Sequence, residues 1–175
     1  MSILGQDWQR IRSDKLHISV NELVGNNGFR AVVLFRLASW FVHRGIPILP
    51  EVLTSLALCL TGAEIRPQAR IGPGLNIKHP GGIVIGWGVS IGANCTILQN
   101  VTIGESLNSY GDHSYPSIGH DVTLCAGSVI IGKIEIGDGA VVGANAVVLS
   151  DVPAGATVAG VPARIVRTEK QTEAK

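Results

Sequence analysis

Residues 118–152, IGHDVTLCAGSVIIGKIEIGDGAVVGANAVVLSDV, repeat one pattern every six residues. A large aliphatic residue opens each unit, at Ile118, Leu124, Ile130, Ile136, Val142 and Val148. A period of six matches neither the 3.6 residues of a helical turn nor the two-residue alternation of a strand. The pattern therefore indicates a solenoid of short flat strands, in which each hexapeptide forms one side of a coil.

The same register extends toward the N-terminus of the chain. Aliphatic residues recur at Ile65, Ile71, Ile77, Ile85, Ile91, Ile97 and Ile103, with a slip of two residues at 83–84. Four positions after most aliphatic residues stands a small or β-branched one: Ala69, Val89, Cys95, Val101, Val122, Ser128, Ala140 and Ala146. Three hexapeptides make one triangular coil, and successive coils pair as parallel strands roughly 4.8 Å apart. The intervals predict about five coils.

Glycine is unusually frequent, with 22 in 175 residues, nearly twice the common share of roughly 7%. Many of these glycines directly follow the aliphatic residue: Gly72, Gly86, Gly92, Gly104, Gly119, Gly137 and Gly143. We expect them to permit the backbone geometry of the coil corners. Collagen is excluded because the glycines do not recur at every third position, and disorder is excluded by a hydrophobic share of 46%.

The repeat is interrupted once, between Ile103 and Ile118. These residues are 15 apart where six would continue the coil, so about nine extra residues leave the solenoid as a loop within 105–116. Insertions in solenoids map to one face and often carry the binding function. A surface loop that is merely tolerated remains the alternative.

The first sixty residues lack the six-residue pattern and read as helices. A turn signal at residues 26–28 precedes a predicted helix over 29–43, and a second predicted helix spans 51–60. The first helix has a narrow polar stripe of Arg36, Ser39 and His43. We expect residues 1–61 to form a cap that covers the open end of the solenoid or packs between subunits.

Charge and cysteine content limit the possible binding partners and the cellular compartment of the protein. With 14 Lys and Arg against 13 Asp and Glu, the chain has no basic arm for nucleic acid. Its three cysteines form no C-x-x-C pair, so we predict neither disulfides nor a metal site. The same cysteine content indicates a protein of the reducing cytoplasm. The longest apolar run, 52–60, is too short to span a bilayer. Weak membrane-surface association through the N-terminal helix stays open, because Arg30, Arg36 and Arg44 flank apolar residues.

Four stretches resemble the hexapeptide-repeat acyltransferases and, among them, the serine acetyltransferase group. They are GAEIRPQARIGPGLNIKHPGGIVIG at 62–86, ILQNVTIG at 97–104, SIGHDV at 117–122 and GDGAVVGANAVVLSDVPAGATVAGVPARIV at 137–166. The resemblance implies a mainly β fold, a left-handed parallel β-helix over 62–166 followed by a flexible tail at 167–175. It also implies a homotrimer that binds acetyl-CoA between neighbouring β-helices and transfers the acetyl group directly to a hydroxyl.

By this resemblance, His79 of the I-x-H-x-x-G segment is the catalytic base. The chemistry suits an imidazole, which can take the proton of a hydroxyl as that hydroxyl attacks a thioester. Glu64 stands where the family has an aspartate that orients the histidine, about one coil earlier in the chain. A solvated carboxylate at the junction of helix and coil is the other interpretation of Glu64.

The resemblance also points to residues for coenzyme A. Gly104, Ala126 and Ala144 would let pantetheine lie against the backbone, whose amides can pair with its own. Arg164, in G-V-P-A-R, is a candidate for the nucleotide phosphates. Purely structural roles remain open for the small residues. The chain has neither a GxxxxGK[ST] loop nor a Rossmann fingerprint.

The chain departs from the family where the acceptor is held. Lys78 replaces an aspartate, residues 114–116 read Ser-Tyr-Pro instead of Arg-His-Pro, and Gly104-Glu105 replaces a double glycine. Loss of a carboxylate clamp disfavours a zwitterionic amino acid. With the short N-terminal region, this favours a sugar or polysaccharide precursor as acceptor.

Four residues are the candidates for binding that acceptor: Lys78, Asp112, His113 and Tyr115. A polar loop tip without a ligand is the alternative for the last three. Authentic serine O-acetyltransferase activity in cysteine biosynthesis is the alternative function. A non-enzymatic scaffold or a metal-dependent hydratase is a third class, and the hydratase would need a histidine cluster that the sequence does not show.

Overall fold

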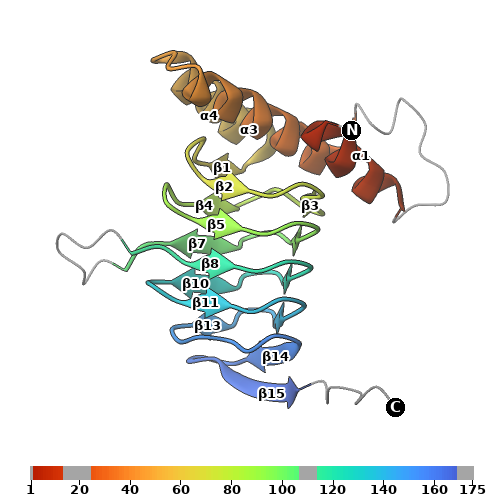
Figure 1. Cartoon of the computed structure of the whole chain (residues 1–175), viewed down its shortest axis with the longest axis vertical. Helices are drawn as coiled ribbons and strands as arrows, with labels where there is room; N and C mark the ends of the chain where they lie inside the picture. Colours follow the sequence, from red (N-terminus) through yellow and green to blue (C-terminus); the bar gives the residue numbers. More distant parts are fainter. Residues whose placement is uncertain (1, 14–24, 107–113, 169–175) are drawn as a thin grey trace.

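The computed structural model describes residues 2–13, 25–106 and 114–168, which form a solenoid with helices across one end (Figure 1). Within these ranges, three sheets form its sides. The first sheet contains β1 (Glu64–Ile65), β4 (Val84–Ile85), β7 (Thr102–Gly104), β10 (Val129–Ile131) and β13 (Val147–Val148). The second contains β2 (Arg70–Ile71), β5 (Ser90–Ile91), β8 (Ser117–Ile118) and β11 (Glu135–Ile136). The third contains β3 (Asn76–Ile77), β6 (Thr96–Ile97), β9 (Thr123–Leu124), β12 (Val141–Val142), β14 (Ala156–Ala159) and β15 (Arg164–Thr168).

The strand register gives the length of each coil. Ser117 pairs with Glu135, three hexapeptides further along the chain, which is the expected length of a coil. Glu64 pairs with Val84, so the first coil is longer by two, and the extra residues fall between β3 and β4. Thr102 pairs with Val129, so the coil that contains the insertion is longer by nine. The predicted slip and the predicted insertion are therefore both confirmed, although residues 107–113 of the insertion lie outside the described residues.

The interior of the solenoid consists of the residues that the repeat singles out. Every predicted aliphatic position from Ile65 to Val148 is buried, and so are the smaller residues of the second position. Cys95 is one of these, and burial raises the pKa of its thiol to about 11. The thiol therefore stays neutral and packs as a small apolar group.

The glycines that follow the aliphatic residues have a different role from the one expected. None of the seven has a positive φ, so none is needed for a left-handed corner. At most of them the neighbours leave little room for a side chain: a Cβ on Gly72 would lie 2.8 Å from the carbonyl carbon of Gly92 in the next coil, whereas a Cβ on Gly104 would meet nothing within 4 Å. The left-handed corners are formed by other residues, including Asn100 and Asn145. Most of these positions therefore require glycine because the coils stack closely, and not because the backbone is left-handed there.

Of the described residues, three helical segments lie across the first coil: α1 (Ile3–Ser13), α3 (Asn27–His43) and α4 (Leu49–Thr61) (Figure 1). α3 begins two residues before its predicted start because the Asn26 side chain caps it, accepting a hydrogen bond from the Phe29 N–H at 3.0 Å. The sequence did not single out α1. The helices cover strand edges that no further coil can pair, which is one of the two arrangements expected for the cap.

The side chains of the cap are not arranged as the sequence suggests. Arg36 was predicted on a polar stripe and was one of the arginines that left membrane-surface association open. It turns inward and forms an ion pair with the buried Asp7 of α1. On α4, Val52 and Leu56 are exposed by 53% and 43%, whereas Thr54 is buried. The outer surface of the cap is thus more apolar at α4 than its inner one. Among the described residues, no helix is long and apolar enough to cross a membrane.

The far end of the solenoid is closed by the chain itself. β14 pairs with β12 in parallel, but β15 folds back and pairs with β14 antiparallel. The last strand therefore breaks the parallel repeat of the third sheet.

Candidate active site

His79 lies at the corner between β3 and β4, where the first coil has its two extra residues. Lys78 and His79 are exposed there, and Pro80 is buried. The corner is anchored at both ends, because the Lys78 N–H donates to Ile97 O at 3.1 Å and the Gly82 N–H donates to Gly62 O at 2.9 Å. No hydrogen bond to the His79 imidazole is found within the described ranges. These backbone hydrogen bonds therefore fix the corner from which the ring projects.

A hollow of about 470 Å³ separates this corner from the start of α3. It is lined by Gly25, Asn26, Asn27, Gly28, Lys78, His79 and Pro80. The two walls approach closely because residue 28 has no side chain: a Cβ there would overlap the carbonyl oxygen of Ile77. Sequence reasoning interpreted residues 26–28 only as a turn, and it missed Asn26 and Asn27 as neighbours of His79. A glycine in the first turn of an otherwise apolar helix was the available signal.

Glu64, the predicted partner of His79, has another neighbour in this structure. Its Oε1 lies 3.9 Å from Nη1 of Arg66, and no hydrogen bond between Glu64 and His79 is found among the described residues. The His79 corner nevertheless bonds to Gly62, two residues before Glu64. A role for Glu64 beside His79 stays a prediction.

Successive corners between the third and the first sheet stack into a column, which we call the His79 edge. It consists of residues 78–82, 98–100, 125–127 and 143–145. Backbone hydrogen bonds connect its layers: Asn100 N–H to Gly81 O, Gly127 N–H to Gln99 O and Asn145 N–H to Ala126 O, each 2.9 Å. Two residues predicted for coenzyme A, Ala126 and Ala144, therefore lie on the same edge as His79.

The other two predicted donor residues lie elsewhere. Gly104 ends β7 at the opposite side of the first sheet, where the inserted loop leaves the solenoid. Arg164 begins β15 in the last coil, donates from Nη1 to Ala163 O at 2.8 Å and lines a hollow of about 720 Å³ with Ser150 and Asp151. The structure does not bring all four residues to one place on a single chain.

The candidate acceptor residues of the loop are only partly described. Asp112 and His113 lie outside the described residues. Tyr115 packs its ring over Gly88, and its hydroxyl donates to Glu105 Oε2 at 3.2 Å. Burial, then the hydrogen bond and the charge of Glu105, raise the pKa of the Tyr115 hydroxyl. Tyr115 thus lies at the base of the loop, and its role in binding the acceptor stays a prediction.

The loop and His79 project from different corners of the triangle. The loop leaves between β7 of the first sheet and β8 of the second, whereas His79 lies between β3 of the third sheet and β4 of the first. The whole first sheet separates them on one chain. In the part of the chain that the structure describes, no three His, Cys, Asp or Glu side chains are grouped to hold a metal ion.

The repeat of this chain matches a known family model, and known proteins are similar to the chain in sequence. Residues 115–150 match the family model for the bacterial transferase hexapeptide with six repeats. A serine acetyltransferase of Synechococcus elongatus is 40% identical over 139 residues, 79% of this chain and 57% of that protein. A serine acetyltransferase of Helicobacter pylori is 38% identical over 143 residues, 82% of this chain and 83% of that protein. The chain belongs to the serine acetyltransferase family.

Solved structures of the serine acetyltransferase family also share the fold. The serine acetyltransferase of Brucella abortus in complex with coenzyme A superimposes with a TM-score of 0.89 at 33% identity, covering 96% of this chain and 68% of that one. The solenoid is a left-handed parallel β-helix, as the resemblance implied. The chain spans a little over half of the Synechococcus relative but most of the Helicobacter one. A short N-terminal region therefore occurs among serine acetyltransferases and does not favour a sugar acceptor.

Proposed function

We propose that this protein transfers the acetyl group of acetyl-CoA to the hydroxyl of serine, with His79 as general base. One observation carries the proposal: His79 is exposed beside a hollow, in a chain that is 38% identical to a serine acetyltransferase of similar length. The acceptor would bind in the hollow, between the His79 corner and the first turn of α3.

The proposed reaction is a direct transfer. The imidazole takes the proton of the acceptor hydroxyl while its oxygen attacks the thioester carbonyl. The new C–O bond forms, the C–S bond breaks, and the thiolate of coenzyme A recovers the proton from the imidazolium. Glu64 would stabilise that imidazolium. Cys125 is on the same edge, but burial raises the pKa of its thiol, which makes an acyl-cysteine intermediate unfavourable near neutral pH.

Acetyl-CoA is proposed to lie along the His79 edge. The small side chains of Ala126 and Ala144 leave backbone groups accessible to pantetheine, and Arg164 in the last coil would bind phosphate. The first and the last coil are four coil spacings apart, or roughly 19 Å. A long donor would therefore run parallel to the axis of the solenoid.

A homotrimer would bring the separated parts of this site together. The His79 edge of one chain and the loop corner of its neighbour would form the two walls of a cleft, since one chain places them on opposite sides of its first sheet. Sedimentation equilibrium of the purified protein is expected to give three times the chain mass. A stable monomer with full activity would rule out the shared cleft.

A sugar hydroxyl is the second candidate acceptor, and Lys78 is the observation that favours it. Lys78 is exposed next to His79, and the described lining of the hollow includes no carboxylate for the ammonium group of serine. A lysine at this position repels an ammonium and tolerates a neutral hydroxyl compound.

Release of free coenzyme A distinguishes the two acceptors. We expect turnover of the wild-type protein with serine, and a higher kcat/KM for serine in Lys78→Asp, because the substitution replaces repulsion of the ammonium by attraction. Neutral sugars serve as the control, and their turnover should change little. Turnover with sugars and none with serine would establish the second acceptor in place of the first.

A further inference from the structure

We propose that Asp7, on α1, is a positioning residue for His79: its buried carboxylate holds the strand that leads into the His79 corner. The proposal rests on the proposed function of His79 as general base. It assigns the cap a part in the reaction, beyond covering the end of the solenoid.

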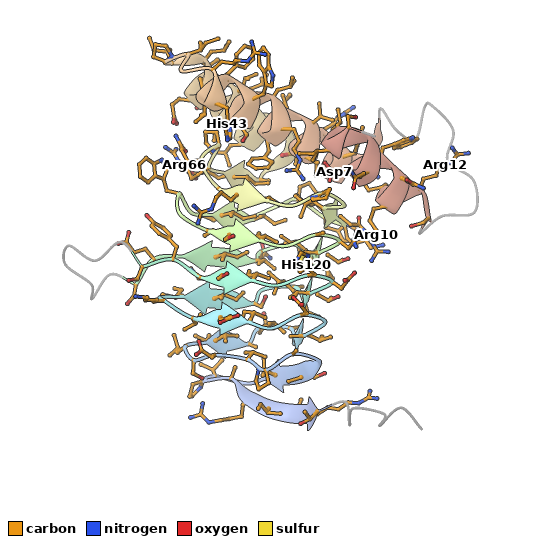
Figure 2. All side chains as sticks on the ribbon, viewed as in Figure 1. Asp7, Arg10, Arg12, His43, Arg66 and His120 are labelled. Carbon is orange, nitrogen blue, oxygen red and sulfur yellow. The ribbon has the colours of Figure 1, made fainter. Side chains whose placement is uncertain are left out.

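The carboxylate of Asp7 is buried, and both of its oxygens accept hydrogen bonds. Its side chain has an exposed fraction of 0% and faces the first coil from α1 (Figure 2). Oδ2 accepts from Nε of Arg36 at 2.9 Å, and Oδ1 accepts from Nη2 of the same guanidinium at 3.1 Å. Oδ1 also accepts from the backbone N–H of Leu75 at 2.9 Å. The last bond joins α1 directly to the first coil.

Arg36 extends the same connection to the coil. Its Nη1 donates to Ile71 O at 2.6 Å and its Nη2 donates to Gly72 O at 2.7 Å. Carbonyls at the equivalent place in later coils accept from a neighbouring coil, as Ile91 O does from the Gly72 N–H. No described coil lies on the outer side of the first one, so the guanidinium serves as the donor there.

This network reaches His79 through a short piece of backbone. Leu75 is followed by β3, and β3 is followed by Lys78 and His79. Among the described strands, β3 ends the third sheet and pairs with β6 alone. On its other side lies the cap, where Gly28 of α3 approaches Ile77. Because no described residue bonds the imidazole itself, the cap and β6 together set where the imidazole stands.

Stability is a weak explanation for such a pair. Removing two charges from water costs more than their attraction commonly returns, and apolar pairs of similar volume are often as stable or more so. A buried pair with bonds to three backbone groups instead fixes one geometry. General-base catalysis needs that accuracy, since a displacement of about 1 Å can lower a rate on the order of 10²-fold.

The test replaces the ion pair by an apolar pair, Asp7→Leu with Arg36→Met, in the full-length protein. We expect the double variant to stay folded and its kcat to fall by about 10- to 100-fold, with KM for acetyl-CoA changed by less than about threefold. Glu51→Gln is the matched control. It breaks another cap-to-coil ion pair, Glu51 Oε2 to Arg66 Nη1 at 3.1 Å, which does not touch β3. Its kcat should stay at the wild-type value, and an equal loss in both variants would overturn the proposal.

A second comparison separates positioning from a general loss of structure. In a His79→Ala background the double substitution should lower the residual rate no further, because a positioning residue acts only through the group it places. A further loss of about 10-fold in that background would contradict the proposal. If the double variant does not fold, Asp7→Glu takes its place, since it keeps the charge pair and displaces the carboxylate by one methylene. It should show a smaller loss of kcat and the same dependence on His79.

NMR signals of the His79 imidazole test the positioning role separately from the proposed function. They can be assigned by NMR from their disappearance in His79→Ala, without any substrate. We expect them to shift in the Asp7 variants and to stay in place in Glu51→Gln. Unchanged signals would overturn the positioning role whatever the activity. An inactive wild-type protein whose His79 signals still depend on Asp7 would instead refute the acetyl transfer alone.

Discussion

Replacement of His79 by alanine is expected to lower kcat for acetyl transfer by about 10²- to 10⁴-fold, the contribution typical of a positioned general base. The side chain is exposed at its corner and no described residue bonds it, so little stability should be lost. Thiol release from acetyl-CoA measures the rate, and a thermal melt checks the fold.

His120→Ala is the matched control for this experiment. His120, labelled in Figure 2, also lies at a coil corner and is exposed, but its Nδ1 accepts a hydrogen bond from the Ala93 N–H at 3.0 Å. Its corner lies between β8 of the second sheet and β9 of the third, away from the His79 edge. Its kcat should stay within about threefold of the wild-type value, a change far smaller than the loss of about 10²-fold or more expected when a general base is removed. Equal rates for the two variants would show that His79 is not the base.

Two interior substitutions should change stability in opposite directions. Ile97 in β6 has an exposed fraction of 0%, and Ile97→Ala is expected to cost about 2–5 kcal/mol of unfolding free energy through lost burial and the cavity it leaves. Ser128 is equally buried, yet its Oγ has no hydrogen-bond partner in the described part of the chain. Ser128→Ala should therefore stabilise the protein by about 1 kcal/mol, since it removes an unpaired polar group.

Chemical denaturation of both variants against the wild-type protein provides the measurement. A loss of stability in Ser128→Ala comparable to that in Ile97→Ala would mean that the hydroxyl has a partner inside the solenoid.

Sequence reasoning reached the solenoid because its interior is periodic. Ile65 and Val148 lie at opposite ends of the repeat, and both are buried in the register that the hexapeptides predict. The prediction that the glycines after the aliphatic residues form the corners was wrong. The sequence does not distinguish a glycine that needs a positive φ from one that has no room for a side chain. Gly72 has no positive φ, and the backbone of Gly92 blocks a side chain there.

The candidate site was predictable only where it is local in sequence. Lys78 and His79 are adjacent in a recognisable motif, and the structure places both at one exposed corner. Asp7 and Arg36 are far apart in the sequence, on two helices, and neither residue shows from its neighbours in sequence that it turns inward. Whether Glu64 serves His79 stays a prediction, because the repeat brings both residues to the same coil without fixing the direction of the Glu64 side chain.

The reversed strand β15 has a consequence for how copies of this protein can associate. A solenoid of parallel strands presents an edge at each end onto which another copy could add its own coils, and repeated addition would produce a fibre. Helices block that edge at the first coil, and an antiparallel strand occupies it in the third sheet at the last. Growth along the axis is thereby opposed at both ends. The proposed homotrimer would instead form through the sides of the rod, where the His79 edge and the loop corner are found.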